Sequence, residues 1–199
     1  TSASAWVPTR IAALDLSPAL TTELAPLFAV YASLNAQIAA ADRRIATVAA
    51  SDPIVARLAT APGVGPVTAS AFVATIDDIT RFRSAHELEA YLGVVPSERS
   101  SGEKRQLGRI TKAGNGRMRW LLVEAGWQIL RSRSAETAAL RAWTRTIAQR
   151  RGKRIAVVAL ARRLAGILYA MWRDGVPYDA QRIRPLAQAV SQAVAQRAG

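Results

Sequence analysis

The sequence predicts a mainly α-helical protein in which a long coiled-coil-like helix precedes a helical domain. Apolar residues recur at three- and four-residue intervals along most of the chain, and no stretch of useful length alternates apolar with polar residues as a strand does. Half of the 199 residues are hydrophobic, which argues against intrinsic disorder. Because the chain starts with Thr1, we expect it to be a piece of a longer protein.

The first helix is expected over residues 18–52, after an irregular lead-in over residues 1–17. Its apolar residues are spaced alternately by four and three, as in the seam of a coiled coil. They are Leu20, Leu24, Leu27, Tyr31, Leu34, Ile38, Ala41, Ile45 and Val48. Pro18 suits the first helical turn, whereas Pro26 suggests that the regular part begins there. The seam either packs on its own domain or pairs with a second helix, which would give a homodimer or higher oligomer.

A helical domain is expected over residues 53–185, followed by a tail over residues 186–199. Its first part, about residues 55–76, has the pattern of a helix-hairpin-helix, with a Pro-Gly-Val-Gly turn between two short helices. Gly63 and Gly65 can take positive φ, and the free N–H groups after such a turn suit a phosphate. The alternative is a simple helix connection whose glycines allow close packing.

The next helix is expected to begin after Ser84. Ser84 and Glu87 form a capping-box pattern, and Gly93 is placed to end the helix. His86 is the only histidine of the chain, so it has no second histidine with which to bind a metal. We expect it on the surface of the first helical turn rather than as a catalytic base.

Two further residue pairs have a structural and a functional interpretation. Asp77 and Asp78 lie between two predicted helices, where turn and cap roles are favoured over metal binding. Trp120 and Trp127 lie seven residues apart on one helical face. Such a stripe favours the core, although tryptophan also stacks on nucleic-acid bases. No metal site is expected on this chain.

The charge of the chain points to a polyanionic partner. Lys and Arg number 27 against 14 acids, a net charge of +13, which favours nucleic acid. A membrane surface is disfavoured because the basic residues are spread over turns and several helices, and no apolar run approaches the ~20 residues of a membrane span. The cations expected to bind nucleic acid are Lys104, Arg105, Arg109, Lys112, Arg117, Arg150, Arg151, Lys153 and Arg154.

A basic serine loop is expected over residues 96–116, with Ser97, Ser100 and Ser101 at its start. A serine hydroxyl is a weak nucleophile, and no histidine is at hand to activate it. With a phosphodiester as substrate, the main task is to position the phosphorus and neutralise charge on its oxygens, which arginine does well. The residues alone favour phosphate holding over nucleophilic attack.

Five motifs in order resemble one family: PGVGPVTASAFVATI, YLGVVP, RSSG, GRITKAGN with a following MRWLL, and DGVPYDAQR. Together they are similar to the C-terminal transposase domain of the pilin-invertase-like insertion-sequence transposases, the group guided by a bridge RNA. The resemblance covers about residues 55–185, and the preceding coiled coil fits it.

The resemblance implies a catalytic serine. In that family the nucleophile lies five residues after the proline of a G-[LV]-x-P motif, which places it at Ser101, counted from Pro96, with Ser100 as the near alternative. Ser101 would attack a DNA phosphodiester and form a covalent phosphoserine link that a DNA hydroxyl later resolves. The basic residues after it would hold the scissile phosphate or the guide RNA.

The family also has an N-terminal RuvC-like domain with four acidic metal ligands, and no such constellation is found in this sequence. The Mg²⁺ ion is therefore expected in that separate domain, with no cofactor bound by this chain. We expect the chain to bind DNA and guide RNA in the bacterial cytoplasm, associated with the nucleoid, but not to cut DNA alone. The alternative is a non-catalytic nucleic-acid-binding module in which Ser101 is an ordinary loop residue.

Overall fold

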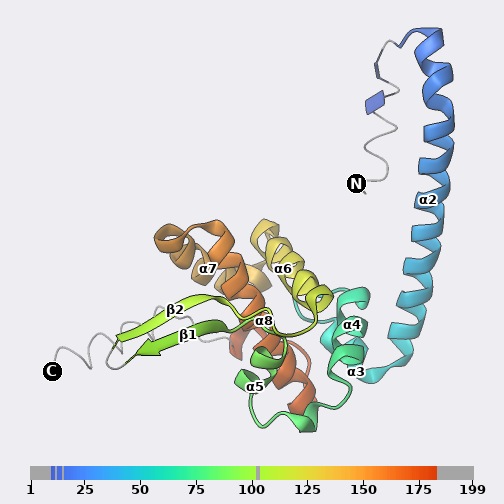
Figure 1. Ribbon diagram of the computed structural model, residues 1–199. Coiled ribbons are helices and arrows are strands. Elements are labelled where there is room, and N and C mark those ends of the chain that lie inside the picture. The colour runs from blue at the N-terminus through green and yellow to red at the C-terminus, as the bar shows by residue number, and fades with distance from the viewer. Residues whose placement is uncertain (1–9, 12, 15, 102–103, 183–199) are drawn as a thin grey trace. The chain divides into compact units, whose positions relative to one another are not determined.

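The computed structural model describes residues 10–182 apart from 12, 15, 102 and 103, so most of the expected lead-in (residues 1–9, 12 and 15) and the whole expected tail lie outside the described residues. The mainly α-helical class is confirmed (Figure 1). The elements are α2 (Pro18–Ser51), α3 (Pro53–Leu58), α4 (Pro66–Ile76), η1 (Ile79–Arg81), α5 (Ala85–Tyr91), β1 (Pro96–Ser101), β2 (Lys104–Ile110), α6 (Gly116–Arg131), η2 (Ala135–Thr137), α7 (Ala138–Arg151), α8 (Lys153–Asp174) and η3 (Ala180–Arg182).

The chain divides into two compact units, with the division between Val48 and Ala49. The first consists mainly of α2, which begins at Pro18 as expected. Pro26 lies inside the helix and does not delay its start, which corrects the expectation that the regular part begins there. Proline removes one amide donor from a helix. The carbonyl that this donor would have bonded is that of Thr22, four residues earlier, and because Thr22 is exposed, water can hydrate it.

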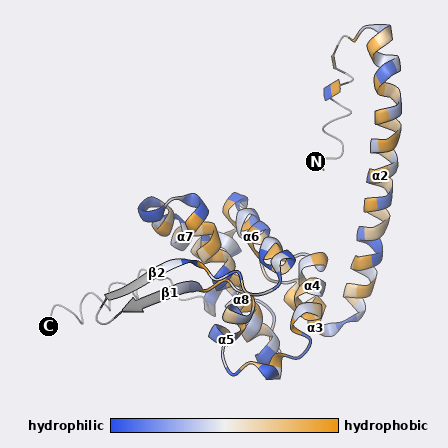
Figure 2. Ribbon diagram, viewed as in Figure 1, coloured by the Kyte–Doolittle hydropathy of each residue, from blue (hydrophilic) through white to orange (hydrophobic). Residues whose placement is uncertain are grey.

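The apolar residues of α2 are mostly exposed. Leu27, Leu34 and Ile38 of the predicted seam are 57–64% exposed, and Ala49 is the only buried residue of the helix. Figure 2 shows apolar residues along α2 as well as on the helices of the second unit. Most of the seam is thus exposed on α2 itself, and pairing with another helix stays a prediction.

Two helices, α2 and α8, are long and apolar enough to cross a membrane by length and composition alone. This corrects the expectation that no apolar run approaches that length, because alanine-rich helices reach it with few charges. Half of the apolar window of α8 is buried inside the protein, as in the core helix of a soluble domain, and α2 lies near the N-terminus, where signal sequences pass the same test. Such a match is weak grounds for a membrane span.

The core of the second unit is built around α8, which packs against α3, α5, α6 and α7. The largest fully buried side chains of this core are Leu58, Phe72, Ile76, Leu88, Leu92, Met118, Leu122, Ile129, Leu140, Leu160, Leu164 and Leu168. Gly126 brings α6 close to α8, since a Cβ there would lie 3.2 Å from a methyl group of Val157.

The predicted turns and caps of this unit are present. Ser84 accepts a hydrogen bond from the Glu87 amide (3.3 Å), and Gly93 after α5 has φ +67°. Asp78 accepts from the amide and hydroxyl of Thr80 (both 2.8 Å), and these bonds, the backbone one first, lower the pKa of its carboxyl. Asp77, at φ 64°, ends α4. Both aspartates are thus turn and cap residues, as predicted.

Candidate serine hairpin and basic surface

Within the segment expected as a loop, β1 and β2 pair as a two-stranded antiparallel sheet that forms a hairpin. Sequence reasoning missed it because its residues are polar on both sides, so no alternation of apolar and polar residues marks the strands. The register pairs Ser101 with Lys104 and Ser100 with Arg105, while a bulge interrupts the pairing at Ser97. Each candidate nucleophile therefore lies directly across the hairpin from a predicted phosphate-binding cation.

The side chains of residues 98–107, which include Ser100, Ser101, Lys104 and Arg105, lie outside the described part of the structure. The backbone places both serines at the end of β1 and both cations at the start of β2.

The base of the hairpin is held by the ends of α5 and α6. The Thr111 amide donates to the Val95 carbonyl (2.9 Å), and the Lys112 amide donates to the Gly93 carbonyl (3.1 Å). Arg119 of α6 donates through Nη1 to the carbonyls of Leu92 (3.3 Å) and Gly114 (2.5 Å). Sequence reasoning missed Arg119, because nothing in its local pattern distinguishes it from the other arginines.

Two glycines allow the backbones to approach at this base. A Cβ at Gly114 would lie 1.9 Å from the Tyr91 carbonyl oxygen, and one at Gly93 would lie 2.5 Å from the Ala113 amide nitrogen. No side chain fits at these distances, so the motifs YLGVVP and GRITKAGN meet backbone to backbone. The hairpin thus projects from a tightly packed junction in the helical unit (Figure 1).

Arg109, Lys112 and Arg117, three of the predicted nucleic-acid cations, are exposed around this junction. Lys112 has φ 58°, which turns the chain between β2 and α6, and Arg117 lies in the first turn of α6. Asn115 caps the helix by accepting from the Met118 amide (3.0 Å). Arg109, Lys112 and Arg117 therefore all face solvent.

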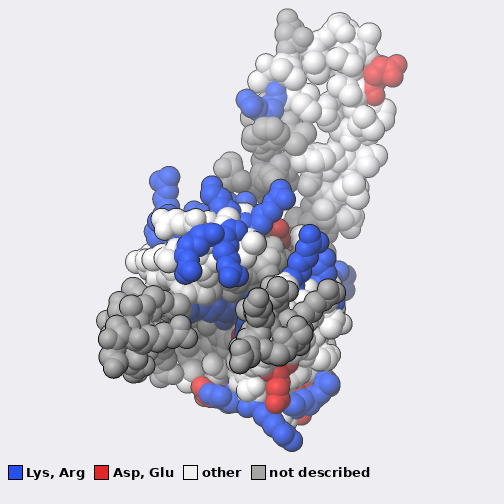
Figure 3. All heavy atoms as spheres, turned by 60° about the vertical axis from the view of Figure 1, so that its left-hand side comes forward, with Lys and Arg blue, Asp and Glu red and all other residues white. Residues whose placement is uncertain are grey.

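The second basic cluster spans the junction of α7 and α8, and its four members, Arg150, Arg151, Lys153 and Arg154, are all exposed. Gly152 divides it with φ +84°, a conformation that side chains rarely adopt. No acid lies between residues 137 and 173. Figure 3 shows Lys and Arg side chains gathered over the helical unit, with few acids between them on the face in view.

Other arginines of this region have structural partners. Arg141 donates to the Ser132 (2.6 Å) and Ser134 (2.9 Å) carbonyls. Arg163 lies over the Trp143 ring, with its central carbon 4.8 Å from the ring centre, and burial lowers the pKa of its guanidinium. The structure thus separates exposed cations, free to meet phosphates, from those that hold the fold.

The two glycines of the predicted helix-hairpin-helix differ. Gly63, at φ +74°, lies against α6, and a Cβ there would be 2.6 Å from the Ala125 carbonyl oxygen. Gly65 has open space around its Cβ position and precedes α4 with no side chain capping that helix. Gly63 therefore fits the packing interpretation. Of the two glycines, only Gly65 has open space beside it into which a phosphate could fit.

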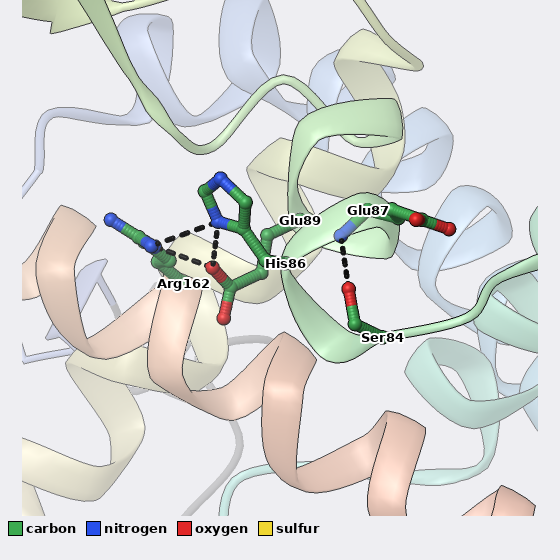
Figure 4. A network of polar contacts seen from close by, with 5 residues as sticks. All are labelled: Ser84, His86, Glu87, Glu89 and Arg162. Carbon is green, nitrogen blue, oxygen red and sulfur yellow. Dashed lines mark hydrogen bonds and ion pairs between the residues drawn. The ribbon is translucent and has the colours of Figure 1, made fainter.

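His86 lies in the first turn of α5 with its side chain 70% exposed, as predicted. It belongs to a polar network that joins α5 to α8 (Figure 4). Arg162 Nε donates to Glu89 Oε2 (2.5 Å), and His86 Nδ1 lies 3.7 Å from that oxygen and 3.3 Å from Arg162 Nη2. Glu89 is buried, so this ion pair is a structural tie between the helices rather than a metal site. Within the part of the chain that the structure describes, no three His, Asp or Glu side chains cluster to hold a metal.

Comparison with known proteins points to one family. Residues 55–141, which contain the hairpin, match the model described as the transposase IS116/IS110/IS902 family. The chain is 35% identical over 139 residues to a "probable family 20 transposase" of Pseudomonas aeruginosa, covering 70% of this chain and 41% of that protein. It is 32% identical over 159 residues to the transposase for insertion sequence element IS1111A of Coxiella burnetii, covering 80% and 44%. It is 29% identical over 165 residues to the transposase for insertion sequence element IS1328 of Yersinia enterocolitica, covering 83% and 49%. The chain therefore spans a little under half the length of these relatives.

Proposed function

Since residues 55–141 match the model of the transposase IS116/IS110/IS902 family, we propose that this chain is the serine-bearing, nucleic-acid-binding part of a transposase. The observation that carries the proposal is the position of the match, which spans the hairpin and its junction with α5 and α6. DNA is the partner that transposition requires, and the exposed cations around the hairpin and the α7–α8 junction fit its phosphates.

Ser101 is the proposed nucleophile. Its Oγ forms a bond to the phosphorus of a DNA phosphodiester while one P–O bond of the strand breaks, and the serine proton ends on the oxygen of the released strand. A DNA hydroxyl later reverses this exchange. The pairing of Ser101 with Lys104 and of Ser100 with Arg105 supports the proposal, because a cation opposite the attacking serine offsets the charge of the phosphate oxygens.

A Mg²⁺ site does not fit the described residues, which offer no cluster of three His, Asp or Glu side chains. No step is therefore assigned to a metal on this chain. The proposal instead makes the hairpin one half of a composite site whose acidic half lies on a separate domain. The isolated chain then binds nucleic acid without cutting it.

The proposed partners also include a guide RNA and a second copy of the chain, which α2 would pair through its exposed seam. The proposed location is the bacterial cytoplasm with the nucleoid, and no membrane partner is proposed. If vesicle flotation carried the chain to the lipid fraction at physiological salt, the membrane would replace nucleic acid as the partner.

The test compares Ser101→Ala with Ser100→Ala in the full-length parent protein. Both variants are incubated with cognate DNA and guide RNA, and covalent protein–DNA adducts are scored on a denaturing gel alongside binding by mobility shift. We expect Ser101→Ala to abolish the adduct and recombination with binding retained, and Ser100→Ala to keep both. Equal loss of binding in Ser101→Ala would favour the non-catalytic binding module.

The half-site is tested with the chain alone under the same conditions. We expect binding whose affinity falls steeply with salt, because phosphate contacts release counterions, and we expect no adduct. An adduct formed by the isolated chain would refute the composite site. A flat salt response would count against any nucleic-acid role.

A further inference from the structure

We infer that Trp120 is a stacking platform for an unpaired nucleic-acid base, beside the cations at the start of α6. Trp120 is 59% exposed, which contradicts the core interpretation of the Trp120 and Trp127 stripe for this residue, while Trp127 is half-buried. The inference rests on the proposed nucleic-acid role. It specifies that the face carrying Trp120 binds unpaired bases.

The exposure of Trp120 follows from its place on the helix. The core face of α6 carries Met118, Leu122 and Ile129. At 100° per residue Trp120 lies about 200° from Met118, and it therefore points away from the core. In the described part of the chain, Trp143 has Arg163 over its ring and Trp172 has Phe72 beside it, whereas neither kind of contact is found for Trp120.

The sequence of the first turn leaves a face of the indole ring open. A helical side chain lies over the turn that precedes its own Cα, which for Trp120 is the turn of Gly116 and Arg117. Gly116 is exposed and has no side chain to cover the ring, and a Cβ there would have only the Arg119 guanidinium within 4 Å, at 3.6 Å. A flat apolar ligand can therefore reach the ring from the N-terminal end of α6.

The charge around the ring favours a base that is attached to a phosphate. Arg117 is exposed three residues before Trp120, a spacing that puts their Cβ atoms about 5–6 Å apart. Lys112 is exposed just before the helix. Glu124, the acid of α6, lies on the C-terminal side and is half-buried, so it directs phosphates towards the Arg117 side.

An unpaired base fits this arrangement better than duplex DNA does. A base within a duplex has both faces stacked on its neighbours, whereas a base in a single strand or a loop has a face to offer an indole. Stacking tolerates any base, so the platform would bind single strands without strong sequence preference. DNA and RNA single strands share this chemistry.

The experiment measures the affinity of the full chain, at one fixed salt concentration, for a 15-nucleotide DNA strand, the matching RNA strand and the matching DNA duplex. The variants are Trp120→Ala, Trp120→Phe and Arg117→Ala, with Ile155→Ala as a control for a large exposed apolar residue (53% exposed) in the same unit. Circular dichroism checks that each variant is folded.

We expect Trp120→Ala to weaken single-strand binding about 5- to 150-fold and duplex binding far less, because one base stack is lost. Trp120→Phe should keep most of the affinity, and Ile155→Ala all of it. Arg117→Ala should weaken all three ligands alike, and a separate salt titration of this variant should show the salt slope reduced by about one. A greater loss for RNA than for DNA would assign the platform to an RNA strand, and the reverse to a displaced DNA strand.

Tryptophan fluorescence gives an independent readout. Single strands should quench the emission of the unsubstituted chain, and the Trp120→Phe chain should lose that part of the quenching while it still binds. If the chain binds all three ligands and Trp120→Ala binds single strands as tightly as the unsubstituted chain does, this inference is wrong and the proposed function stands. If the chain binds none of the ligands, both are wrong.

Discussion

Alanine at Gly63 should destabilise the protein and alanine at Gly65 should leave its stability almost unchanged, although the two glycines are only two residues apart. At Gly63 the backbone has φ +74°, and a Cβ would lie 2.6 Å from the Ala125 carbonyl oxygen and 3.2 Å from Ile129 Cγ1. The positive φ costs alanine about 1–2 kcal/mol. Pushing the turn at Gly63 away from α6 costs a further ~1–3 kcal/mol.

Gly63→Ala should therefore lower the free energy of unfolding by about 2–5 kcal/mol, the sum of these two costs. Each kcal/mol lowers the melting temperature of a unit of this size by about 2–4 °C. Gly65→Ala meets no atom within 4 Å and keeps an ordinary φ of −91°, so its change in stability should stay within about 0.5 kcal/mol.

Urea unfolding followed by circular dichroism measures both changes. Duplex binding by Gly65→Ala then tests the phosphate interpretation of the turn, because that variant is expected to remain folded. A loss of stability in Gly63→Ala within 0.5 kcal/mol of that in Gly65→Ala would refute the packing argument. Unchanged duplex affinity in Gly65→Ala would leave the turn with a structural role alone.

The remaining predictions concern the seam, the hairpin base, a cap and the core. Replacing both Leu34 and Ile38 by Glu should convert an oligomer to a monomer, as measured by analytical ultracentrifugation. The helical unit should keep its melting temperature, because both side chains are exposed in the single chain. An unchanged mass would exclude the seam as the interface. Arg119→Met should speed hydrogen exchange at the base of the hairpin, since two carbonyls lose a charged donor worth about 1.5–3 kcal/mol; unchanged protection there would mean that the backbone pairs suffice. Asp78→Asn should destabilise the protein slightly at pH 6, because the folded-state pKa of Asp78 lies below its ordinary value and the carboxylate stabilises only while it is ionised. The loss should shrink as the pH falls through that lowered pKa, and a loss that does not change with pH would contradict this. Phe72→Ala should cost about 3–5 kcal/mol in urea unfolding, because the ring is fully buried, and a loss under 1 kcal/mol would show that the site collapses around the cavity.

The helical class and the helix ends were predictable because they depend on local chemistry. Ser84 caps α5, Asp78 caps η1, and Gly93 turns the chain, all through bonds to residues within four positions. The same reasoning failed at Pro26, where one missing donor proved too small a penalty to delay the helix. It also missed the hairpin, whose polar strands are held by backbone bonds to each other.

The sequence by itself determined which residues are cationic, where glycine frees the backbone, and the order of motifs that points to a transposase. Only the tertiary structure decided which of these residues face solvent. Arg119 and Arg162 are bound to carbonyls and a carboxylate, whereas Arg117 and Arg154 are exposed; Trp120 faces outward although its spacing matches a core stripe. The physical reason is that periodicity places a residue on one face of a helix, but the helices packed against that face decide whether it is covered.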